Sequence, residues 1–383
     1  MELDTFEWLL TDAGQGLLQL IGEESSLGAM QRLRNTYSPD QVAAAASTAQ
    51  LRDKARDKFG TAAQHMYFTR EALEQSTRLR VARHRAGRVV AANPSSIIDL
   101  GCGIGGDLVA FAEAGLTTAG IDLDPVRVAM ARANLAALGL PGAVSVADAT
   151  SLDLGGFGVR YIDPARRSAR GRSFSPDSWL PSWDFVTQLM RTESCIKTAP
   201  GIPHSLVPEG VEAEFVSDHG ALKEAVLWSG MLATTARRAT VLGDGGLATL
   251  ESQDSPDPVV GEVAEFLYEP DDAVIRAGLV MAVAQGVGGH LIDPKIAWVT
   301  SSGAFTTPFA KGYRITEEVP YREKQLKAAL RERGIGSLTI KKRGVDVVPE
   351  QLRKRLALKG SNQAVLVLTR AHNKGVAWLV EPV

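Results

Sequence analysis

The residues best suited to chemistry lie in one short stretch, residues 97–107, which reads IIDLGCGIGGD. An apolar run ends at Asp99, glycines follow at 101, 103, 105 and 106, and Asp107 opens an apolar segment with helical spacing. This order predicts a strand, a tight turn and a helix, the first βα unit of a nucleotide-binding doubly wound sheet. Glycines permit positive φ and let a ligand approach the backbone, and the first N–H groups of the helix face that ligand.

The glycine spacing alone leaves two cofactors open, because Gly106 also occupies the third glycine position of the dinucleotide fingerprint. The carboxylate before the glycines favours S-adenosylmethionine (SAM) over a dinucleotide. With it, D-L-G-C-G-I-G-G-D resembles motif I of class I SAM methyltransferases. SAM carries a cationic ammonium, which Asp99 is suited to bind. The resemblance implies that SAM is the cofactor and that the turn binds it through Asp99, Gly101, Gly103, Gly105 and Asp107. The alternative is a glycine turn with a purely structural role.

A second acid follows at the spacing of the ribose-binding carboxylate in such folds. The apolar run 118–121 ends at Asp122, about 20 residues after the glycines. The resemblance implies that Asp122, with Leu123 beside it, contacts the ribose hydroxyls of SAM. Asp124 precedes Pro125 and a helical pattern, so it reads as a helix N-cap rather than a ligand.

A third acid, Asp148, lies near the end of the predicted strand at residues 144–149. The resemblance implies that Asp148 and Ala149 contact the adenine of the cofactor. The carboxyl ends of parallel strands meet at one edge of a sheet, and we therefore expect Asp99, Asp122 and Asp148 to converge there.

A fourth acid, Asp163, ends the predicted strand at residues 158–162 and opens the sequence D-P-A-R. This sequence resembles the Asp/Asn-Pro-Pro-aromatic motif of amino-methylating enzymes, in which the polar side chain holds the acceptor amino group and the ring stacks on the base. Ala165 and Arg166 replace the second proline and the ring. A guanidinium can itself stack on a base or hold a phosphate. The resemblance implies that Asp163 contacts both SAM and the acceptor, and that the catalytic residues are Asp163, Pro164 and Arg166.

Two alternatives stay open around this motif. Trp179 or Trp183 can supply the missing ring, or both can be loop or core aromatics. The sequence D-P-A-R also resembles the motif of 5-methyluridine RNA methyltransferases, which attack through a nearby cysteine. Cys195 lacks the sequence that flanks that nucleophile and reads as a buried residue.

The bulk composition is that of an ordinary globular protein of 383 residues, with 45% apolar and 22% charged residues. No apolar run approaches the ~20 residues that span a bilayer, and the acidic start lacks the basic region of a signal peptide. Two cysteines and six histidines show no zinc spacing, so no metal is expected. Cys102 lies inside the glycine turn, which argues against a structural disulfide, and we expect a cytoplasmic protein.

Positive charge gathers in particular segments although the net charge is −2. Residues 51–88 hold ten basic and four acidic side chains, and residues 311–374 hold sixteen basic and six acidic ones. The loop Arg166–Arg172 adds four arginines, at positions 166, 167, 170 and 172. Such patches are typical of proteins that bind a polyanion such as RNA. The alternatives are solvated helix faces for the two segments and salt bridges to Asp177 or Asp184 for the loop.

Phrases across most of the chain resemble the bacterial SAM-dependent methyltransferases that carry a C-terminal THUMP-like domain. They are LRDKARDKF, FTREALEQ, DLGCGIGGD, DPARR, EPDDAVIRAG and IKKRGVD. THUMP domains bind RNA in tRNA-modifying enzymes, so the resemblance implies an enzyme that methylates a base in structured RNA. Two other hypotheses remain: a methyltransferase of small molecules or proteins whose C-terminal domain mediates dimerisation, and a catalytically silent RNA-binding protein.

The predicted fold class is α/β, with a seven-stranded Rossmann-like methyltransferase core between an N-terminal helical cap and a C-terminal α/β THUMP-like domain. The expected domains are residues 1–90, 91–250 and 259–383, with a linker at residues 252–258. A helix is expected from residue 69 to 90 and another over 273–284. Strands at 213–217 and 224–228 complete the core, one of them inserted antiparallel, and residues 237–250 add a hairpin.

Overall fold

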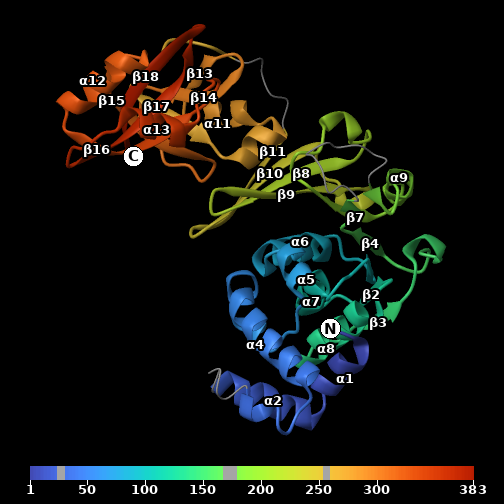
Figure 1. Ribbon diagram of the computed structural model, residues 1–383. Helices are drawn as coiled ribbons and strands as arrows, with labels where there is room; N and C mark the ends of the chain where they lie inside the picture. The colour runs from blue at the N-terminus through green and yellow to red at the C-terminus, as the bar shows by residue number, and fades with distance from the viewer. Residues whose placement is uncertain (24–30, 167–178, 253–258) are drawn as a thin grey trace. The chain divides into compact units, whose positions relative to one another are not determined.

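The computed structural model describes residues 1–23, 31–166, 179–252 and 259–383 (Figure 1). These residues form two compact units. The first consists of residues 1–212 and 225–234, and the second of residues 213–224 and 235–383. The boundary runs through strands β8 (Glu212–Asp218) and β9 (Ala221–Trp228), each of which contributes residues to both units. The predicted division into residues 1–90, 91–250 and 259–383 remains a proposal.

The described residues before position 92 are mostly helical, as predicted. The helices are α1 (Leu3–Leu9), α2 (Asp12–Glu23), α4 (Pro39–Phe59), α5 (Arg70–Gln75) and α6 (Leu79–Ala91), with the 3-10 turn η1 (Gly60–Gln64). A capping box begins α4: Gln41 N donates to Ser38 Oγ at 3.2 Å, and Ser38 N donates to Gln41 Oε1 at 2.9 Å. None of the helices that the structure describes is long and apolar enough to cross a lipid bilayer.

The helix predicted from residue 69 to 90 is wrong in one respect, because it is interrupted at residues 76–78 between α5 and α6. Lys58 of α4 explains the break. Its ammonium group donates to the carbonyl oxygens of Leu73, Glu74 and Ser76 at 2.7–2.8 Å. Carbonyl groups at a helix end need partners, and here a distant lysine supplies them, which no local pattern reveals.

A mainly parallel sheet forms the core of the first unit, in the order β9–β7–β4–β1–β2–β3. Its parallel strands are β1 (Ile97–Leu100), β2 (Thr118–Asp122), β3 (Ala143–Val146), β4 (Val159–Ile162) and β7 (Ser194–Thr198). Because these strands are parallel, the residues that follow them share one edge of the sheet. The predicted Rossmann-like α/β core is confirmed.

The N-terminal helices share a hydrophobic core with the helices that cover this sheet. Those helices include α7 (Gly106–Glu113) and α8 (Pro125–Ala137). Phe6 of α1, Phe59 of α4 and Phe111 of α7 are at most 2% exposed and belong to one continuous cluster. The helical cap is therefore packed into the core of the first unit, and blue and cyan segments lie against each other in Figure 1.

A buried amide ties the N-terminal segment to the glycine loop. Asn134 of α8 is fully buried, and its Oδ1 accepts from Tyr67 N at 2.7 Å. Its Nδ2 donates to Tyr67 O at 3.1 Å and to Ile104 O at 2.8 Å. One side chain thus satisfies three buried backbone groups and holds the loop that follows β1.

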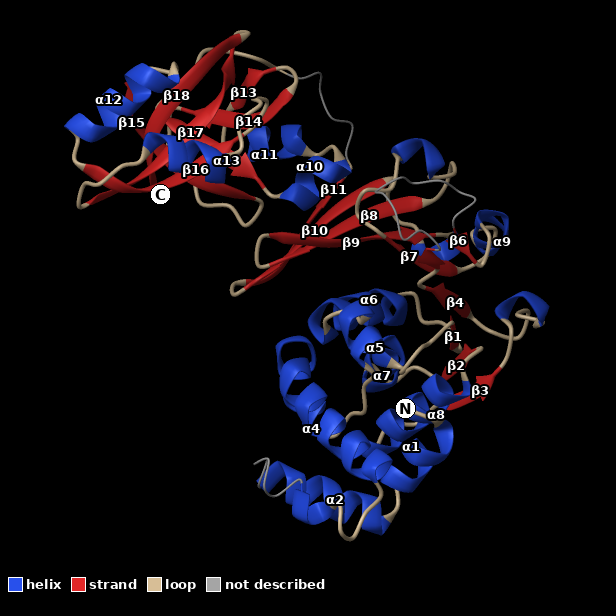
Figure 2. Cartoon of the chain, viewed as in Figure 1, coloured by secondary structure: helices blue, strands red, loops and turns tan. Residues whose placement is uncertain are grey.

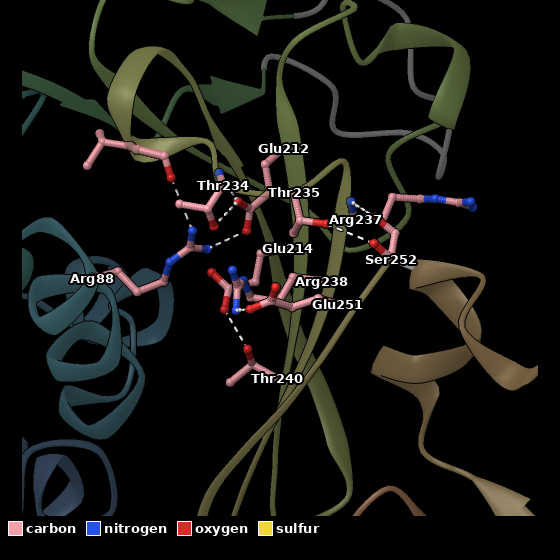
Figure 3. Close-up of polar contacts among 11 residues, drawn as sticks. Arg88, Glu212, Glu214, Thr234, Thr235, Arg237, Arg238, Thr240, Glu251 and Ser252 are labelled. Carbon is pink, nitrogen blue, oxygen red and sulfur yellow. Dashed lines mark hydrogen bonds and ion pairs between the residues drawn. The ribbon is translucent and has the colours of Figure 1, made fainter. Parts of the chain in front are cut away.

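The buried acids of β8 are satisfied by specific partners (Figure 3). In the first unit, Arg88 Nη1 lies 2.7 Å from Glu212 Oε1, and Thr234 N donates to Glu212 Oε2 at 2.8 Å. In the second unit, Thr240 Oγ1 donates to Glu214 Oε1 at 2.5 Å. A fully buried carboxylate is tolerated when it is paired and hydrogen-bonded in this way.

The predicted antiparallel strand is confirmed. β9 pairs antiparallel with β7 and lies between β7 and β8 in strand order. In the second unit, β10 (Arg237–Gly243) pairs parallel with β8, and β11 (Gly246–Glu251) pairs antiparallel with β10. The last two strands are the hairpin expected at residues 237–250.

The second unit also contains a seven-stranded sheet in the order β13–β14–β12–β15–β18–β17–β16 (Figure 2). Its strands are β12 (Phe266–Pro270), β13 (His290–Asp293), β14 (Ile296–Ser301), β15 (Ala310–Val319), β16 (Ile335–Lys342), β17 (Asn362–Ala371) and β18 (Lys374–Pro382). The helices are α10 (Asp272–Ala277), α11 (Val280–Gly286), α12 (Glu323–Glu332) and α13 (Pro349–Leu356). Leu326 and Leu330 of α12 join Leu352 and Leu356 of α13 in one cluster with Leu366 of β17.

Two features of this part were not expected from the sequence. The helix predicted over 273–284 is divided into α10 and α11 at Gly278, whose φ is +72°. Strand β18 follows β17 through His372 and Asn373, which have φ of +49° and +63°. Such a two-residue turn normally carries glycine, and its absence hides the hairpin from sequence patterns.

We expect Asn134→Ala to lower the free energy of unfolding of the first unit by about 2–4 kcal/mol, because it leaves one buried N–H and two buried carbonyls without partners. Urea unfolding measures this loss, and hydrogen exchange should accelerate in peptides that contain Tyr67 and Ile104. Asn35→Ala, at an exposed asparagine, is the matched control. Unchanged exchange in both peptides would contradict the proposed clamp.

Candidate active site

The loop after β1 has the backbone shape that its glycines predict. Gly101, Gly103 and Gly105 have φ of +97°, +55° and +81°, a region that other residues rarely adopt. A Cβ atom added at Gly101 or Gly103 would meet no atom within 4 Å, so the backbone is open to a ligand there. A Cβ at Gly105 would lie 3.2 Å from Ala131 Cβ, so this glycine also allows α7 to pack on α8.

Asp122, at the end of β2, fastens this loop to the next one. Gly103 N donates to its Oδ2 at 2.9 Å, and Asp124 N donates to its Oδ1 at 2.9 Å. Its side chain is mostly buried, whereas the neighbouring Leu123 is 69% exposed. The predicted N-cap role of Asp124 is confirmed, since Val126 N donates to its Oδ1 at 2.8 Å. Each oxygen of Asp122 keeps a second lone pair that can accept from a hydroxyl group.

Two acids flank the glycine loop, Asp99 in a buried position and Asp107 in a partly buried one. Asp99 is 2% exposed. Burial raises its pKa most, and the charges of Asp107, Asp163 and Asp122 raise it further, whereas Arg85 lowers it. Asp107 pairs with the buried Arg85 and accepts from Tyr161 Oη at 2.9 Å. The acids at the ends of β1, β2 and β4 therefore lie close enough to interact.

Asp148 differs from Asp99 and Asp122 in its exposure to solvent. It is exposed, follows β3, and accepts from Thr150 N at 2.9 Å and from Thr150 Oγ1 at 2.7 Å. These hydrogen bonds lower the pKa of Asp148. It caps the 3-10 turn η2 (Ala149–Ser151), which begins at the predicted ligand Ala149.

Asp163 follows β4 and is held by a lysine of the neighbouring strand. The ammonium group of Lys197, on β7, forms an ion pair with Asp163 Oδ2. The lysine side chain is 13% exposed and the Asp163 side chain 42% exposed. Pro164, the next residue, is buried.

The sequence after Pro164 forms a short two-stranded ribbon. β5 (Ala165–Arg166) pairs antiparallel with β6 (Trp179–Leu180). Arg167, Arg170, Arg172 and Asp177 lie outside the described residues. Trp179 is 3% exposed and lies edge-on to Trp183, with ring centroids 4.8 Å apart. Trp179 is therefore a core aromatic, whereas Trp183 is partly exposed.

Both cysteines are buried thiols that form no disulfide, and burial is what the sequence predicts for Cys195. Burial raises the pKa of the Cys102 thiol most, and the charges of Asp99 and Asp122 raise it further, so the thiol stays protonated. Across the ranges that the structure describes, no group of three or more His, Cys, Asp or Glu side chains could hold a metal ion.

Several residues of the site were not predicted from the sequence. The sequence marks Arg85 only as one cation of the basic segment 51–88, yet it shares the apolar face of α6 with Ala82, Ala86 and Val89. That placement is the signal that could have revealed a buried cation. Lys197 and Asn134 carry no comparable local signal, because their partners come from distant parts of the chain.

The chemistry of this edge suits a cationic nucleoside. Carboxylates gather beside an open glycine loop, and the first turn of α7 directs N–H groups toward the same place. Asp99 can bind an ammonium group, and Asp122 can accept from ribose hydroxyls. The backbone at Gly101 and Gly103 leaves space for a ligand. The residues present therefore fit S-adenosylmethionine.

Comparisons with known proteins agree with this geometry. The family "Methyltransferase domain" matches residues 97–161, "THUMP domain-like" matches residues 310–382, and "Domain of unknown function (DUF8688)" matches residues 2–55. Two relatives from Mycobacterium tuberculosis, strains CDC 1551 / Oshkosh and ATCC 25618 / H37Rv, are uncharacterised S-adenosylmethionine-dependent methyltransferases. Each is 37% identical over 336 residues, which cover 84% of this chain and 91% of the relative.

A solved structure extends the likeness to the whole chain. It is that of a proposed methyltransferase from Porphyromonas gingivalis W83, and it covers 99% of this chain and 97% of its own length. The TM-score is 0.77 at 20% identity, so the two proteins share the fold. The identity to the mycobacterial relatives and the two domain matches show the family. The chain belongs to the S-adenosylmethionine-dependent methyltransferases with a C-terminal THUMP-like domain, and S-adenosylmethionine is its cofactor.

Proposed function

We propose that this enzyme methylates a base in structured RNA, such as tRNA or rRNA. The observation that carries the proposal is the basic surface of the THUMP-like domain. α12 and α13 turn their leucines toward the sheet, which leaves their charged faces to solvent. A face of this composition suits a phosphate backbone.

The basic surface, as named here, consists of exposed residues on α12 and α13. Lys324 and Arg331 of α12 and Lys354 of α13 are exposed, and no ion pair joins them to any other described residue. The helices are also tied together, since Arg355 Nε lies 3.0 Å from Glu323 Oε1 and Lys327 Nζ donates to Arg355 O at 2.6 Å. These contacts hold α12 and α13, and so the three cations, in fixed positions relative to each other.

The N-terminal basic segment contributes less to an RNA surface than its composition indicates. Most of its cations bond within the protein, namely Arg52, Arg56, Lys58, Arg78, Arg83, Arg85 and Arg88. We therefore place the main RNA contacts on the basic surface. The arginines of the Arg166–Arg172 loop are proposed to hold a phosphate beside the acceptor.

The mechanism assigns separate tasks to the edge residues. When bound, SAM supplies a methyl group on a sulfonium. Asp99, Asp107, Asp122 and Asp148 would hold and orient it, with Gly101, Gly103, Gly105, Leu123 and Ala149 lining the same place. Asp163 would accept a hydrogen bond from the acceptor amino group and align its nitrogen. The methyl carbon and the nucleophile must approach to about 3–3.5 Å, which such positioning favours.

Pro164 and Arg166 would complete the acceptor side. Pro164 is buried and limits the backbone freedom of the motif. Arg166 is proposed to stack on the base or bind its phosphate, and the partly exposed Trp183 is an alternative stacking ring.

Deletion of the gene should remove one methylated nucleoside from cellular RNA. Mass spectrometry of nucleosides from total tRNA and rRNA measures this, and the wild-type gene should restore the modification. If no modification disappears, the RNA proposal fails, and transfer to a small molecule or protein becomes the better hypothesis.

We expect Asp163→Ala to reduce methyl transfer at least about 100-fold while SAM affinity stays nearly unchanged, because the carboxylate acts on the acceptor. Transfer from tritiated SAM to RNA of the deletion strain and calorimetric titration with SAM measure the two properties. An equal loss of both would place Asp163 on the cofactor instead.

Replacing Lys324, Arg331 and Lys354 with glutamine should weaken tRNA binding about tenfold or more at low salt. The slope of log K against log salt should fall by up to about 3, because each phosphate contact releases a counterion. Filter binding over a salt series measures this. Lys223→Gln with Lys295→Gln, outside the basic surface, is the control, and equal effects of both sets would contradict a specific surface.

A further inference from the structure

We infer that Lys197 is a positioning residue for methyl transfer, which fixes the Asp163 carboxylate so that one of its oxygens faces the acceptor. The inference deepens the proposed function and rests on the role of Asp163 at the acceptor. Lys197 is not part of any motif recognised in the sequence.

The register of two parallel strands brings these residues together. Tyr161 of β4 is paired with Cys195 of β7, and Ile162 with Ile196. The next residues along the chain are Asp163, directly after β4, and Lys197, within β7. Side chains alternate between the faces of a strand, so Asp163 and Lys197 share the face of Tyr161 and Cys195.

The ion pair uses only part of the Asp163 carboxylate. Lys197 bonds to Oδ2, and the described residues offer no hydrogen bond to Oδ1. The lysine is mostly buried while the carboxylate is more open. Asp163 Oδ1 can therefore accept one further hydrogen bond, while Lys197 holds the other oxygen in place.

The surrounding charges make this lysine necessary. Asp163 lies close enough to the buried Asp99 to raise its pKa, as does Asp107. The cation that faces these two acids is Arg85, which bonds to Asp107. Without Lys197, the Asp163 carboxylate would face like charges and would be free to rotate away from the acceptor.

A second lysine, Lys58, lies near Lys197 but is bonded to backbone carbonyls and does not pair with Asp163. Burial lowers the pKa of Lys58 most, and the nearby charges of Arg78 and Lys197 lower it further. Lys58 donates to three backbone carbonyls. Lys197 is thus the lysine with a carboxylate partner here, and Lys58 is occupied in capping α5.

The experiment compares Lys197→Met, which removes the charge, with Lys197→Arg, which keeps it. Methyl transfer is measured with tritiated SAM and total RNA from a deletion strain. Calorimetric titration with SAM alone measures the affinity for SAM. Lys223→Met, at a partly buried lysine of β9, is the matched control. We expect Lys197→Met to lower kcat about 100-fold, the scale of a misplaced catalytic group. SAM affinity should stay near that of the wild type, and Lys197→Arg should restore most of the transfer.

Either of two results with Lys197→Met would overturn the inference. One is normal transfer by Lys197→Met, and the other is a parallel loss of SAM affinity and transfer, which would make Lys197 a donor-binding residue. Failure of Lys197→Arg to recover any activity would also count against a role through charge.

A double-mutant cycle separates this inference from the proposed function. Lys197→Met, Asp163→Asn and the double variant are compared by thermal unfolding, which needs no acceptor. We expect the double variant to lose less Tm than the sum of the single variants, because each single change leaves its partner without a counterpart. Additive losses would show that the two side chains are not coupled. If wild-type enzyme fails to methylate RNA but the coupling is present, the RNA proposal fails while the pairing of Lys197 with Asp163 stands.

Discussion

The crowding of carboxylates at one edge of a parallel sheet is the constraint on which the rest of the structure depends. Asp99 lies in β1, Asp122 ends β2 and Asp163 follows β4. Parallel strands bring such residues to the same edge of the sheet. Like charges at short range repel one another, more strongly where the surroundings are apolar. Each acid therefore has its own compensation. Backbone N–H groups serve Asp122, a lysine serves Asp163, and burial raises the pKa of Asp99. A cationic cofactor completes this balance of charge.

The N-terminal helices contribute a positive charge to this group of acids. Arg85 of α6 bonds to Asp107 and lies over the ring of Tyr161, with 5.0 Å between its guanidinium carbon and the ring centroid. Asn134 clamps Tyr67 to the glycine loop. The helices thus stabilise the loop and supply a buried cation behind it. Within residues 51–88, Arg85 and Arg88 are therefore used inside the protein, since their side chains are only 1% and 15% exposed.

In the THUMP-like domain, apolar and charged side chains lie on different faces of two helices. In α12 and α13, leucines four residues apart face the sheet, and most of the remaining positions carry charge. Part of this charge forms ion pairs, such as Arg355 with Glu323, and part remains exposed. Lys324, Arg331 and Lys354 are exposed and form no ion pair with another described residue, so they are available for a partner. The unit therefore keeps its core and its candidate surface on opposite sides of the same two helices.

The sequence by itself determined the βα order, the glycine turn, the acids at the strand ends and the family, because these depend on short-range spacing and on the identity of a few residues. It also predicted the antiparallel strand and the N-cap at Asp124, which follow local rules. Only the tertiary structure decided which charges face one another. Lys197 meets Asp163 through strand register, Lys58 ends α5 from a different helix, and Arg85 is buried although it lies in a basic segment. Such contacts join residues far apart in the chain, and their energy depends on burial and distance, which no local pattern encodes.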